Sequence, residues 1–216
     1  MSGLFISFEG TEGSGKSTQV SLLAEHLRFE GYTVRTIREP GGTPIGEEIR
    51  HTLKHSADNA AMTAETELLL MNASRAQLVR EVIRPALNAG EIVICDRFYD
   101  STTAYQGYGR QLDLKMVKAI IDVAVGETRP DITLLFVVPH EITADRLLKR
   151  QSTLPFMRDR IEEADRSFFE RVAKGYQAIA AAEPQRIHPI NASGSVEDMK
   201  SAIWKLLQGR LPPRGN

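Results

Sequence analysis

The stretch that most constrains the fold is residues 10–18, which read GTEGSGKST. They match the pattern G-x-x-x-x-G-K-[ST] of a phosphate-binding loop. An apolar run at residues 4–8 predicts a buried strand before the loop, and Val20, Leu23 and Leu27 predict a helix after it. This context lets backbone N–H groups and a helix N-terminus face phosphate oxygens. The sequence therefore predicts a phosphate site, and a glycine-rich turn without a ligand is the alternative.

Composition limits what the rest of the chain can be. The 216 residues are 42% hydrophobic, which suits one α/β domain with its own core. The formal net charge is −1 with both signs interspersed, so the sequence does not indicate a nucleic-acid partner. No stretch has about 18 apolar residues, so we expect no membrane association and a cytoplasmic location. Cys95 is the single cysteine and is expected to be a buried bystander.

Strand and helix patterns alternate along the whole sequence. Strands are predicted at residues 4–8, 32–37, 91–95, 132–138 and 186–190, with helical patterns between them. Thr43 and Thr63 are expected to begin helices, and Pro85 to kink or end the second of these. The alternation predicts an α/β fold of three layers, a five-stranded parallel sheet with helices on both faces. We expect residues 1–216 to form one domain of this kind.

Charged and polar segments follow several of these strands, where an open parallel sheet places its ligands. Residues 38–43 form a Pro- and Gly-rich loop, and residues 101–110 are rich in aromatic and hydrogen-bonding side chains. Asp96 and Arg97 end the third strand and are either ligand-binding residues or a strand-terminal ion pair. Arg75 falls on an apolar helical stripe, so it must reach outward or meet an anion.

The region of about residues 149–161 loses apolar periodicity and carries several basic side chains. It is expected to be a flap over the site, with a solvated loop as the alternative. The sequence lacks the N-K-x-D motif of guanine-nucleotide switches, and its length is short for a motor or helicase. The small size and the basic residues directed at one sheet edge favour a kinase for a small phosphorylated acceptor.

Six segments make this assignment specific: FEGTEGSGKST, REPGGT, LLLMNASRAQ, DRFYDSTTAYQGYGR, RPDITLLF and DRIEEADRSFFERV. In this order and at these separations, they resemble the bacterial thymidylate kinase family over nearly the whole chain. The resemblance implies a phosphate-loop kinase fold, and a reaction in which ATP and dTMP give ADP and dTDP with Mg²⁺. It also implies a homodimer, packed through long helices such as that of residues 65–84.

The resemblance assigns the phosphate-transfer residues. Lys16 and Arg97 would hold the transferring phosphoryl group, Ser17 and Asp96 would serve Mg²⁺, and Arg97 with Arg75 would grip the acceptor phosphate. No general base is required, because the attacking phosphate is already mostly ionised at pH 7. The ATP phosphates would lie against the whole loop: Gly10, Thr11, Glu12, Gly13, Ser14, Gly15, Lys16, Ser17 and Thr18.

The acceptor pocket also follows from the resemblance. Glu12 would meet the sugar hydroxyl, and Tyr105 would exclude a 2′-hydroxyl. Thr102 and Gln106 would bond the thymine edge. The complete set implied for dTMP is Glu12, Pro40, Arg50, Met71, Arg75, Arg97, Thr102, Tyr105 and Gln106.

Two positions, Met71 and Val137, depart from the family pattern, and at Gly13 the family itself varies. Met71 stands where a phenylalanine usually stacks on thymine, which implies broader base selection with activity retained. Val137 stands where an aspartate is common. Gly13 stands where some members have an arginine, which implies that Arg150, Arg158 or Arg160 of the flap supplies that charge. The alternatives are a related kinase for another small acceptor, or an ATP-binding regulatory protein without catalysis.

Overall fold

The computed structural model describes residues 3–56, 58–139, 142, 143, 146, 161 and 165–213. Within them, five strands form one sheet in the order β2-β3-β1-β4-β5, with every neighbouring pair parallel. The expected α/β fold with a five-stranded parallel sheet is therefore confirmed. The strands are β1 (Leu4–Gly10), β2 (Val34–Arg38), β3 (Ile92–Asp96), β4 (Ile132–Val137) and β5 (Ile187–Asn191).

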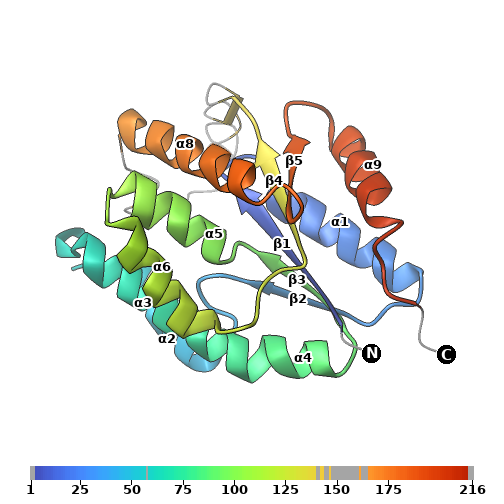
Figure 1. Cartoon of the computed structure of the whole chain (residues 1–216), viewed down its shortest axis with the longest axis horizontal. Helices are drawn as coiled ribbons and strands as arrows, with labels where there is room; N and C mark the ends of the chain where they lie inside the picture. The colour runs from blue at the N-terminus through green and yellow to red at the C-terminus, as the bar shows by residue number, and fades with distance from the viewer. Residues whose placement is uncertain are drawn as a thin grey trace.

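Helices connect the strands and cover the sheet (Figure 1). The α-helices are α1 (Lys16–Phe29), α2 (Pro44–Lys54), α3 (Ala64–Leu78), α4 (Arg84–Asn88), α5 (Tyr99–Thr102), α6 (Leu114–Val125), α8 (Arg166–Ala182) and α9 (Val196–Leu207). A 3₁₀ turn, η1, spans Asn59–Ala61, and two π-helical segments, η2 and η3, span Val79–Ile83 and Thr103–Gly109. None of the described helices has the length and apolar character needed to cross a membrane.

The predicted helix starts are found in the structure. Thr43 accepts a hydrogen bond from the Gly46 N–H at 3.0 Å, and Thr63 accepts one from the Thr66 N–H at 3.3 Å. Pro85 does not end the long segment that Thr63 begins. The α-helix that Thr63 begins is instead interrupted by the π-helical segment η2. Pro85 then lies in the first turn of α4, where its missing N–H costs little.

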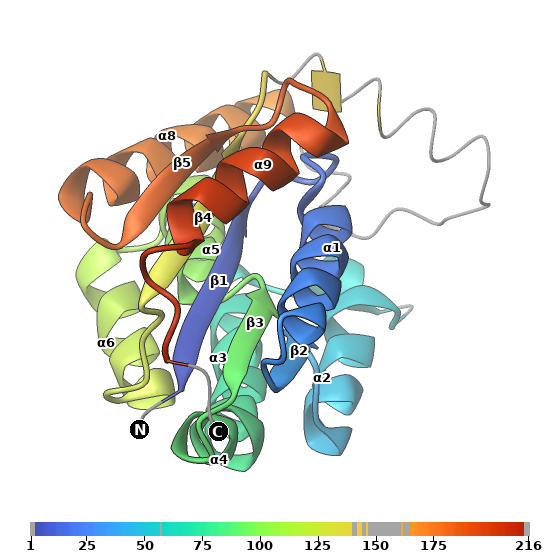
Figure 2. The ribbon, with the colours of Figure 1, turned by 90° about the vertical axis from the view of Figure 1, so that its right-hand side faces the viewer.

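The core forms two layers because side chains alternate along each strand. Leu4, Ile6 and Phe8 face one side of the sheet and pack with α1 and α9. Phe5 faces the other side, where α3, η2 and α6 pack, and Cys95 is buried there as expected. The views in Figures 1 and 2 show helices on both sides of the sheet.

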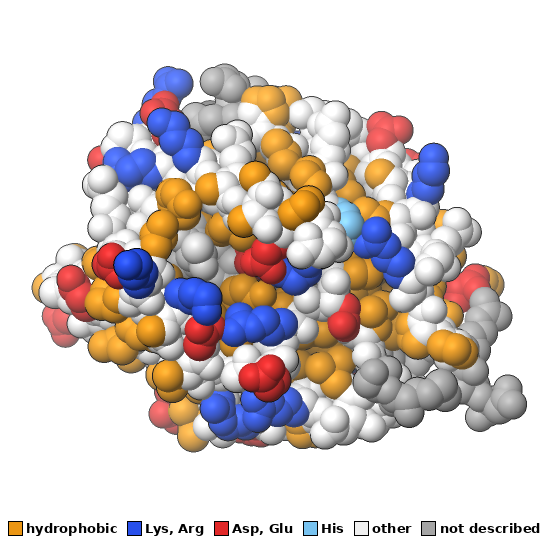
Figure 3. All heavy atoms as spheres, in the orientation of Figure 1, with side chains coloured by type: hydrophobic (Ala, Val, Ile, Leu, Met, Phe, Trp, Pro, Cys, Tyr) orange, Lys and Arg blue, Asp and Glu red, His pale blue; other side chains and the backbone are white. Residues whose placement is uncertain are grey.

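Strand register brings the ends of three strands to one edge. Phe8 and Arg38 both lie opposite Asp96, so β2 and β3 end level with each other, and β1 between β3 and β4 runs two residues further, to Gly10. β2 starts and ends later than predicted, and β3 runs one residue further, to Asp96. The loop after β1, the loop after β2 and the Arg97 segment therefore meet at this edge. On the molecular face in Figure 3, Lys and Arg side chains lie beside Asp and Glu side chains, in keeping with the interspersed charges of the sequence.

Candidate active site

The loop between β1 and α1 closes around the amine of Lys16. The Lys16 Nζ donates hydrogen bonds to the carbonyl oxygens of Gly10 at 3.1 Å and Thr11 at 2.8 Å. Gly13 and Gly15 have φ values of 74° and 94°, which glycine adopts without a steric cost. The loop thus has the compact shape in which successive N–H groups can face an anion at the N-terminus of α1.

The amine of Lys16 is buried among charges of both signs. Burial lowers the pKa of Lys16 to about 8, and repulsion from Arg97 acts in the same direction against the attraction of Glu12. With a pKa of about 8 the amine is mostly charged at pH 7, and a phosphate beside it would stabilise that charge further. The site therefore favours a ligand with phosphate groups at this position.

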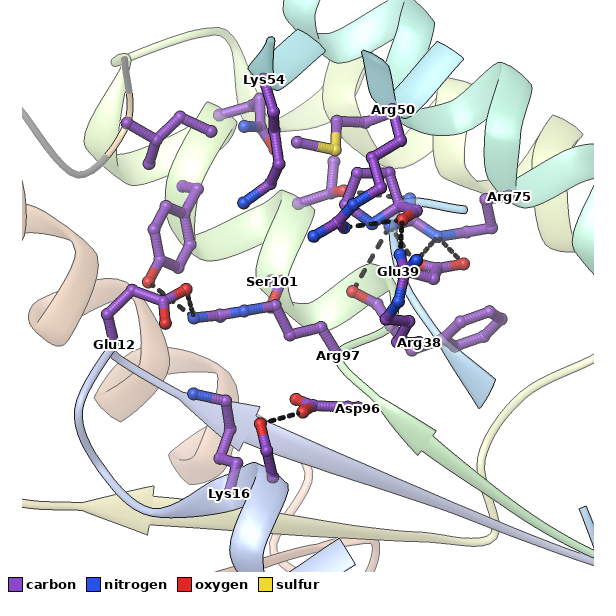
Figure 4. Close-up of a pocket in the computed structure, with 18 of the residues that line it drawn as sticks. Glu12, Lys16, Arg38, Glu39, Arg50, Lys54, Arg75, Asp96, Arg97 and Ser101 are labelled. Carbon is purple, nitrogen blue, oxygen red and sulfur yellow. Dashed lines mark hydrogen bonds and ion pairs between the residues drawn. The ribbon is translucent and has the colours of Figure 1, made fainter. Parts of the chain in front are cut away.

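Ser17 and Asp96 connect α1 to the end of β3. The Ser17 hydroxyl donates a 2.6 Å hydrogen bond to Asp96 Oδ2, as Figure 4 shows. Mg²⁺ prefers oxygen ligands and is commonly held by one or two protein groups together with substrate phosphates and water. A hydroxyl and a carboxylate at this separation, beside a phosphate loop, fit that requirement.

Arg97 is held at the centre of the site by four oxygen atoms. Its Nη2 donates to Glu12 Oε1 at 2.8 Å and to the Tyr105 hydroxyl at 3.3 Å. Its Nη1 donates to the hydroxyls of Ser101 at 3.1 Å and Tyr176 at 3.3 Å. The backbone of Arg97 has a φ of 72°, a left-handed conformation that is uncommon for arginine and typical of functional positions.

The carboxylate of Glu12 is held in its ionised form. Burial would raise its pKa, but Arg97, Lys16 and Lys54 together outweigh burial and hold the pKa of Glu12 well below its ordinary value. Glu12 therefore offers only hydrogen-bond acceptors to a ligand at neutral pH, which suits a hydroxyl group.

A cavity of about 360 Å³ opens over these residues. In Figure 4, Lys16 and Asp96 lie on its strand side, Arg50 and Lys54 enter from α2 on the opposite side, and Arg97 lies between. Such a volume suits a small organic ligand. The lining residues are Glu12, Lys16, Ser17, Arg38, Glu39, Pro40, Arg50, Lys54, His55, Met71, Arg75, Asp96, Arg97, Phe98, Ser101, Thr102, Tyr105, Gln106 and Ile161.

Arg75 forms an ion pair with a carboxylate of the protein itself, that of Glu39. It is 2% exposed, and its Nε and Nη2 donate to the Glu39 carboxylate at distances from 2.6 to 3.2 Å. Its Nη1 donates to Asn72 Oδ1 at 2.8 Å and to Thr102 Oγ1 at 3.0 Å, and its Nη2 also reaches the Phe98 carbonyl at 3.4 Å. All five N–H groups thus have partners within the protein, and the contact to Thr102 ties Arg75 to the start of η3.

The loop after β2 is fixed by two further arginines. Arg50 Nη1 donates to the Pro40 carbonyl at 2.9 Å, and Arg38 Nη1 donates to the same oxygen at 3.1 Å. Pro40 and Met71 both line the cavity, from the loop and from α3 respectively. The two residues form an apolar part of the wall, where a flat ring could pack.

Comparison with known proteins identifies the family. The sequence profile described as Thymidylate kinase matches residues 8–203. The chain belongs to the thymidylate kinase family. It is 46% identical over 212 residues to a protein named Thymidylate kinase from Chlorobium luteolum, covering 96% of this chain and 98% of that one. It is 47% identical over 208 residues to one from Alcanivorax borkumensis, covering 96% and 97%.

A solved structure agrees with this assignment. The crystal structure of thymidylate kinase from Ehrlichia chaffeensis superposes with a TM-score of 0.78 at 35% identity, covering 96% of this chain and 99% of that chain. The resemblance, the fold and the enzyme class expected from the sequence are confirmed. A non-catalytic protein and a kinase of another acceptor are not favoured.

The cavity unites every residue that the thymidylate kinase resemblance assigned to the acceptor. These are Glu12, Pro40, Arg50, Met71, Arg75, Arg97, Thr102, Tyr105 and Gln106. Lys16, Ser17 and Asp96 line the same cavity. The individual roles of these residues stay predictions, since proximity alone does not assign a role.

Some predicted residues cannot be placed. Arg150, Arg158 and Arg160 lie outside the described residues, as does most of the expected flap. Arg146 is described, and its Nη1 lies 3.4 Å from the Gly13 carbonyl of the phosphate loop. Val137 is at the end of β4 with 48% of its surface exposed, so an apolar side chain there meets solvent.

Sequence reasoning missed a buried acid beneath Arg97. Glu9 accepts hydrogen bonds from the Phe98 N–H at 2.7 Å, the Ser101 hydroxyl at 2.5 Å and the Tyr176 hydroxyl at 3.0 Å. Burial, with repulsion from Asp100, raises the pKa of Glu9 to about 7. A charged residue at the end of an otherwise apolar strand was the available signal.

Proposed function

We propose that this member of the thymidylate kinase family transfers the γ-phosphoryl group of ATP to dTMP in the described cavity, giving dTDP and ADP for dTTP supply. The observation that carries the proposal is that three phosphate-loop residues, Glu12, Lys16 and Ser17, line one cavity together with all the acceptor residues. Because those residues come from separate segments of the chain, their convergence supports one nucleotide site with donor and acceptor ends.

Catalysis by this site consists of positioning and charge neutralisation. The attacking oxygen belongs to a phosphate that is mostly ionised at pH 7, so no general base is needed. Lys16 and Arg97 lie where the transferring group would pass between donor and acceptor. The planar fork of Arg97 suits bidentate phosphate contacts, and its four oxygen partners hold it in one orientation.

Ser17 and Asp96 would hold Mg²⁺, Asp96 through water. The ion would neutralise charge on the ATP phosphates and orient them toward the acceptor. The remaining loop residues bind the phosphates through their backbone N–H groups. One flap arginine, Arg150, Arg158 or Arg160, is proposed to close over ATP, and Arg146 adds a cation already beside the loop.

The acceptor lies with its sugar at Glu12 and its base toward α3. Tyr105 is held against Arg97, with the guanidinium 5.1 Å from the ring centroid, and in this proposal it would exclude a 2′-hydroxyl from the acceptor. Thr102 and Gln106 bond the base edge. Arg97 with Arg75 would grip the acceptor phosphate, and Arg75 is also bonded to Thr102.

Base selection should be strict for the base edge and modest for the methyl group. Unpaired buried donors and acceptors would reject cytosine strongly, whereas one methyl group gives about 1–3 kcal/mol of discrimination. Met71 can pack on a ring face in place of the usual phenylalanine. We therefore expect dUMP to be a weak substrate.

The assembly and location follow from the same proposal. We propose a homodimer that packs through α3 and α6, since Leu69 of α3 is 56% exposed and Val123 of α6 is 77% exposed. Light scattering in solution tests it. The reaction is placed in the cytoplasm, where ATP and deoxynucleotides are available.

The decisive experiment is coupled ADP production with ATP and Mg²⁺ across dTMP, dUMP, dCMP, dGMP, AMP and shikimate. Fast turnover of dTMP with slower turnover of dUMP is the expected result. Preference for another acceptor would keep the phosphate-loop mechanism but overturn the base assignment. ADP release that no acceptor stimulates would favour an ATP-binding regulatory protein.

A further inference from the structure

A buried trio of side chains lies behind the base end of the cavity. Glu67 lies in the first turn of α3 and is fully buried, and Gln106 lies in η3 and is 2% exposed. The Gln106 Nε2 donates to Glu67 Oε1 at 2.7 Å. Arg110, which follows η3, donates to both Glu67 oxygens, at 3.3 Å from Nε and 3.0 Å from Nη2.

The chemistry of the trio fixes which way the Gln106 amide points. An ionised carboxylate can only accept hydrogen bonds, and a guanidinium can only donate them. The Arg110 ion pair favours the ionised form of Glu67, so Gln106 must turn its NH₂ group toward Glu67. Its amide oxygen is then directed away from the trio. Among the described residues, none donates a hydrogen bond to this oxygen, and the Gln106 side chain lines the cavity.

We propose that Glu67 is a specificity-determining positioning residue, which holds Gln106 so that an amide oxygen faces the acceptor base. This inference rests on the proposed dTMP kinase function. An oxygen at that place accepts from a ring N–H, which thymine and uracil carry at N3. Cytosine has an acceptor at N3, so two lone pairs would face each other. Glu67 thus decides that thymine and uracil are accepted and cytosine is rejected, although it does not contact the base.

The test is Glu67→Gln. The shorter Arg110 contact runs from Nη2 to Oε2 at 3.0 Å, against 3.3 Å from Nε to Oε1, so the amide oxygen of the introduced side chain takes the Oε2 place and its NH₂ group faces Gln106. Gln106 then has to turn its oxygen toward that NH₂ group and presents its own NH₂ group to the base. The expected result is lower kcat/KM for dTMP and dUMP, higher kcat/KM for dCMP, and a dTMP-to-dCMP ratio reduced on the order of 100-fold.

Direct binding gives a second readout. Calorimetric titration without ATP should show the same changes in Kd, weaker binding of dTMP and dUMP and tighter binding of dCMP, and the KM for ATP should stay unchanged. Glu65→Gln is the matched control, because Glu65 is an exposed glutamate in the same helical turn. The Glu65→Gln variant should have the same dTMP-to-dCMP ratio of kcat/KM as the wild type.

A second variant covers the case in which Glu67→Gln does not fold. Glu67→Asp keeps the charge pair with Arg110 but is one methylene shorter, so it should loosen Gln106 and lower the ratio about tenfold without reversing it. If dTMP and dCMP activities fall in parallel in the folded variants, Glu67 serves only stability and the inference is wrong. A wild-type enzyme without dTMP preference would instead contradict the proposed function itself.

Discussion

The guanidinium of Arg97 lies 2.8 Å from the carboxylate of Glu12, across 85 residues of sequence. The contact joins the residue after β3 to the phosphate loop after β1. It places a cation between the loop that would hold ATP and the pocket that would hold the acceptor. A change at Arg97 should therefore affect chemistry more than folding.

Arg97→Ala should reduce acceptor-stimulated ADP production on the order of 1,000-fold or more, because it removes a positioned cation from the transferring phosphoryl group. The coupled assay with ATP, Mg²⁺ and dTMP measures this. Arg35→Ala is the control, since Arg35 forms an exposed ion pair with Glu91 and its loss should change the rate by less than about twofold. Wild-type rates in Arg97→Ala would show that the catalytic assignment is wrong.

Asp96→Asn should raise the free Mg²⁺ concentration needed for half-maximal rate by about 10–100-fold, the cost typical of losing a carboxylate near a bound metal. The variant keeps a hydrogen-bond acceptor for Ser17, so the local fold should hold. Rates at saturating ATP and dTMP over a Mg²⁺ series measure the effect. An unchanged Mg²⁺ profile would remove Asp96 from the metal site.

ATP binding should be linked to proton uptake near pH 8, because burial lowers the pKa of Lys16 to about 8 and bound phosphates favour the charged amine. Affinity should fall as pH rises from 8 to 10, where free Lys16 is increasingly neutral. Calorimetry in buffers of different ionisation enthalpy measures the protons taken up. Lys16→Arg should lose this linkage, since arginine stays charged in this range; equal uptake by both proteins would point to another group.

Glu9→Gln should flatten the pH dependence of stability. Burial raises the pKa of Glu9 from 4.5 to about 7, so the folded state binds more protons than the unfolded state between these values. The contribution of Glu9 to the free energy of unfolding therefore decreases as pH rises from 4.5 to 7, by up to about 1.4 kcal/mol per pH unit. Denaturant unfolding at several pH values measures the slope. An identical slope in wild type and variant would show that Glu9 does not titrate there.

Local patterns accounted for most of the architecture. Residues 10–18 indicated the loop, apolar runs indicated the strands, and Thr43 and Thr63 indicated helix starts that the structure contains. These features depend on neighbours within a few residues, so they can be recognised without the fold. The predicted C-terminal end of β3 was one residue short, because pairing with β1 and β2 extends the strand to Asp96.

The partners of charged residues were much harder to infer. The spacing of Arg75 required either outward reach or an anion, and the structure supplies Glu39, 36 residues away. Glu67 lies in the first turn of α3, where acidic residues are common, yet it is buried against Gln106, 39 residues away. In both cases the helical spacing is compatible with an exposed charge and with a buried one. Only the packing of α3 in the fold decides which of the two occurs.

Short-range periodicity and a motif of fixed spacing were enough to predict the parallel α/β fold, the phosphate loop and the edge of the sheet where the candidate site lies. The tertiary structure decided how the charges at that edge pair. It set Arg97 against Glu12, Arg75 against Glu39, Gln106 against Glu67 and Glu9 beneath the site. The reason is that ion pairs and hydrogen bonds act over a few ångströms, and only strand register and helix packing bring such distant residues that close.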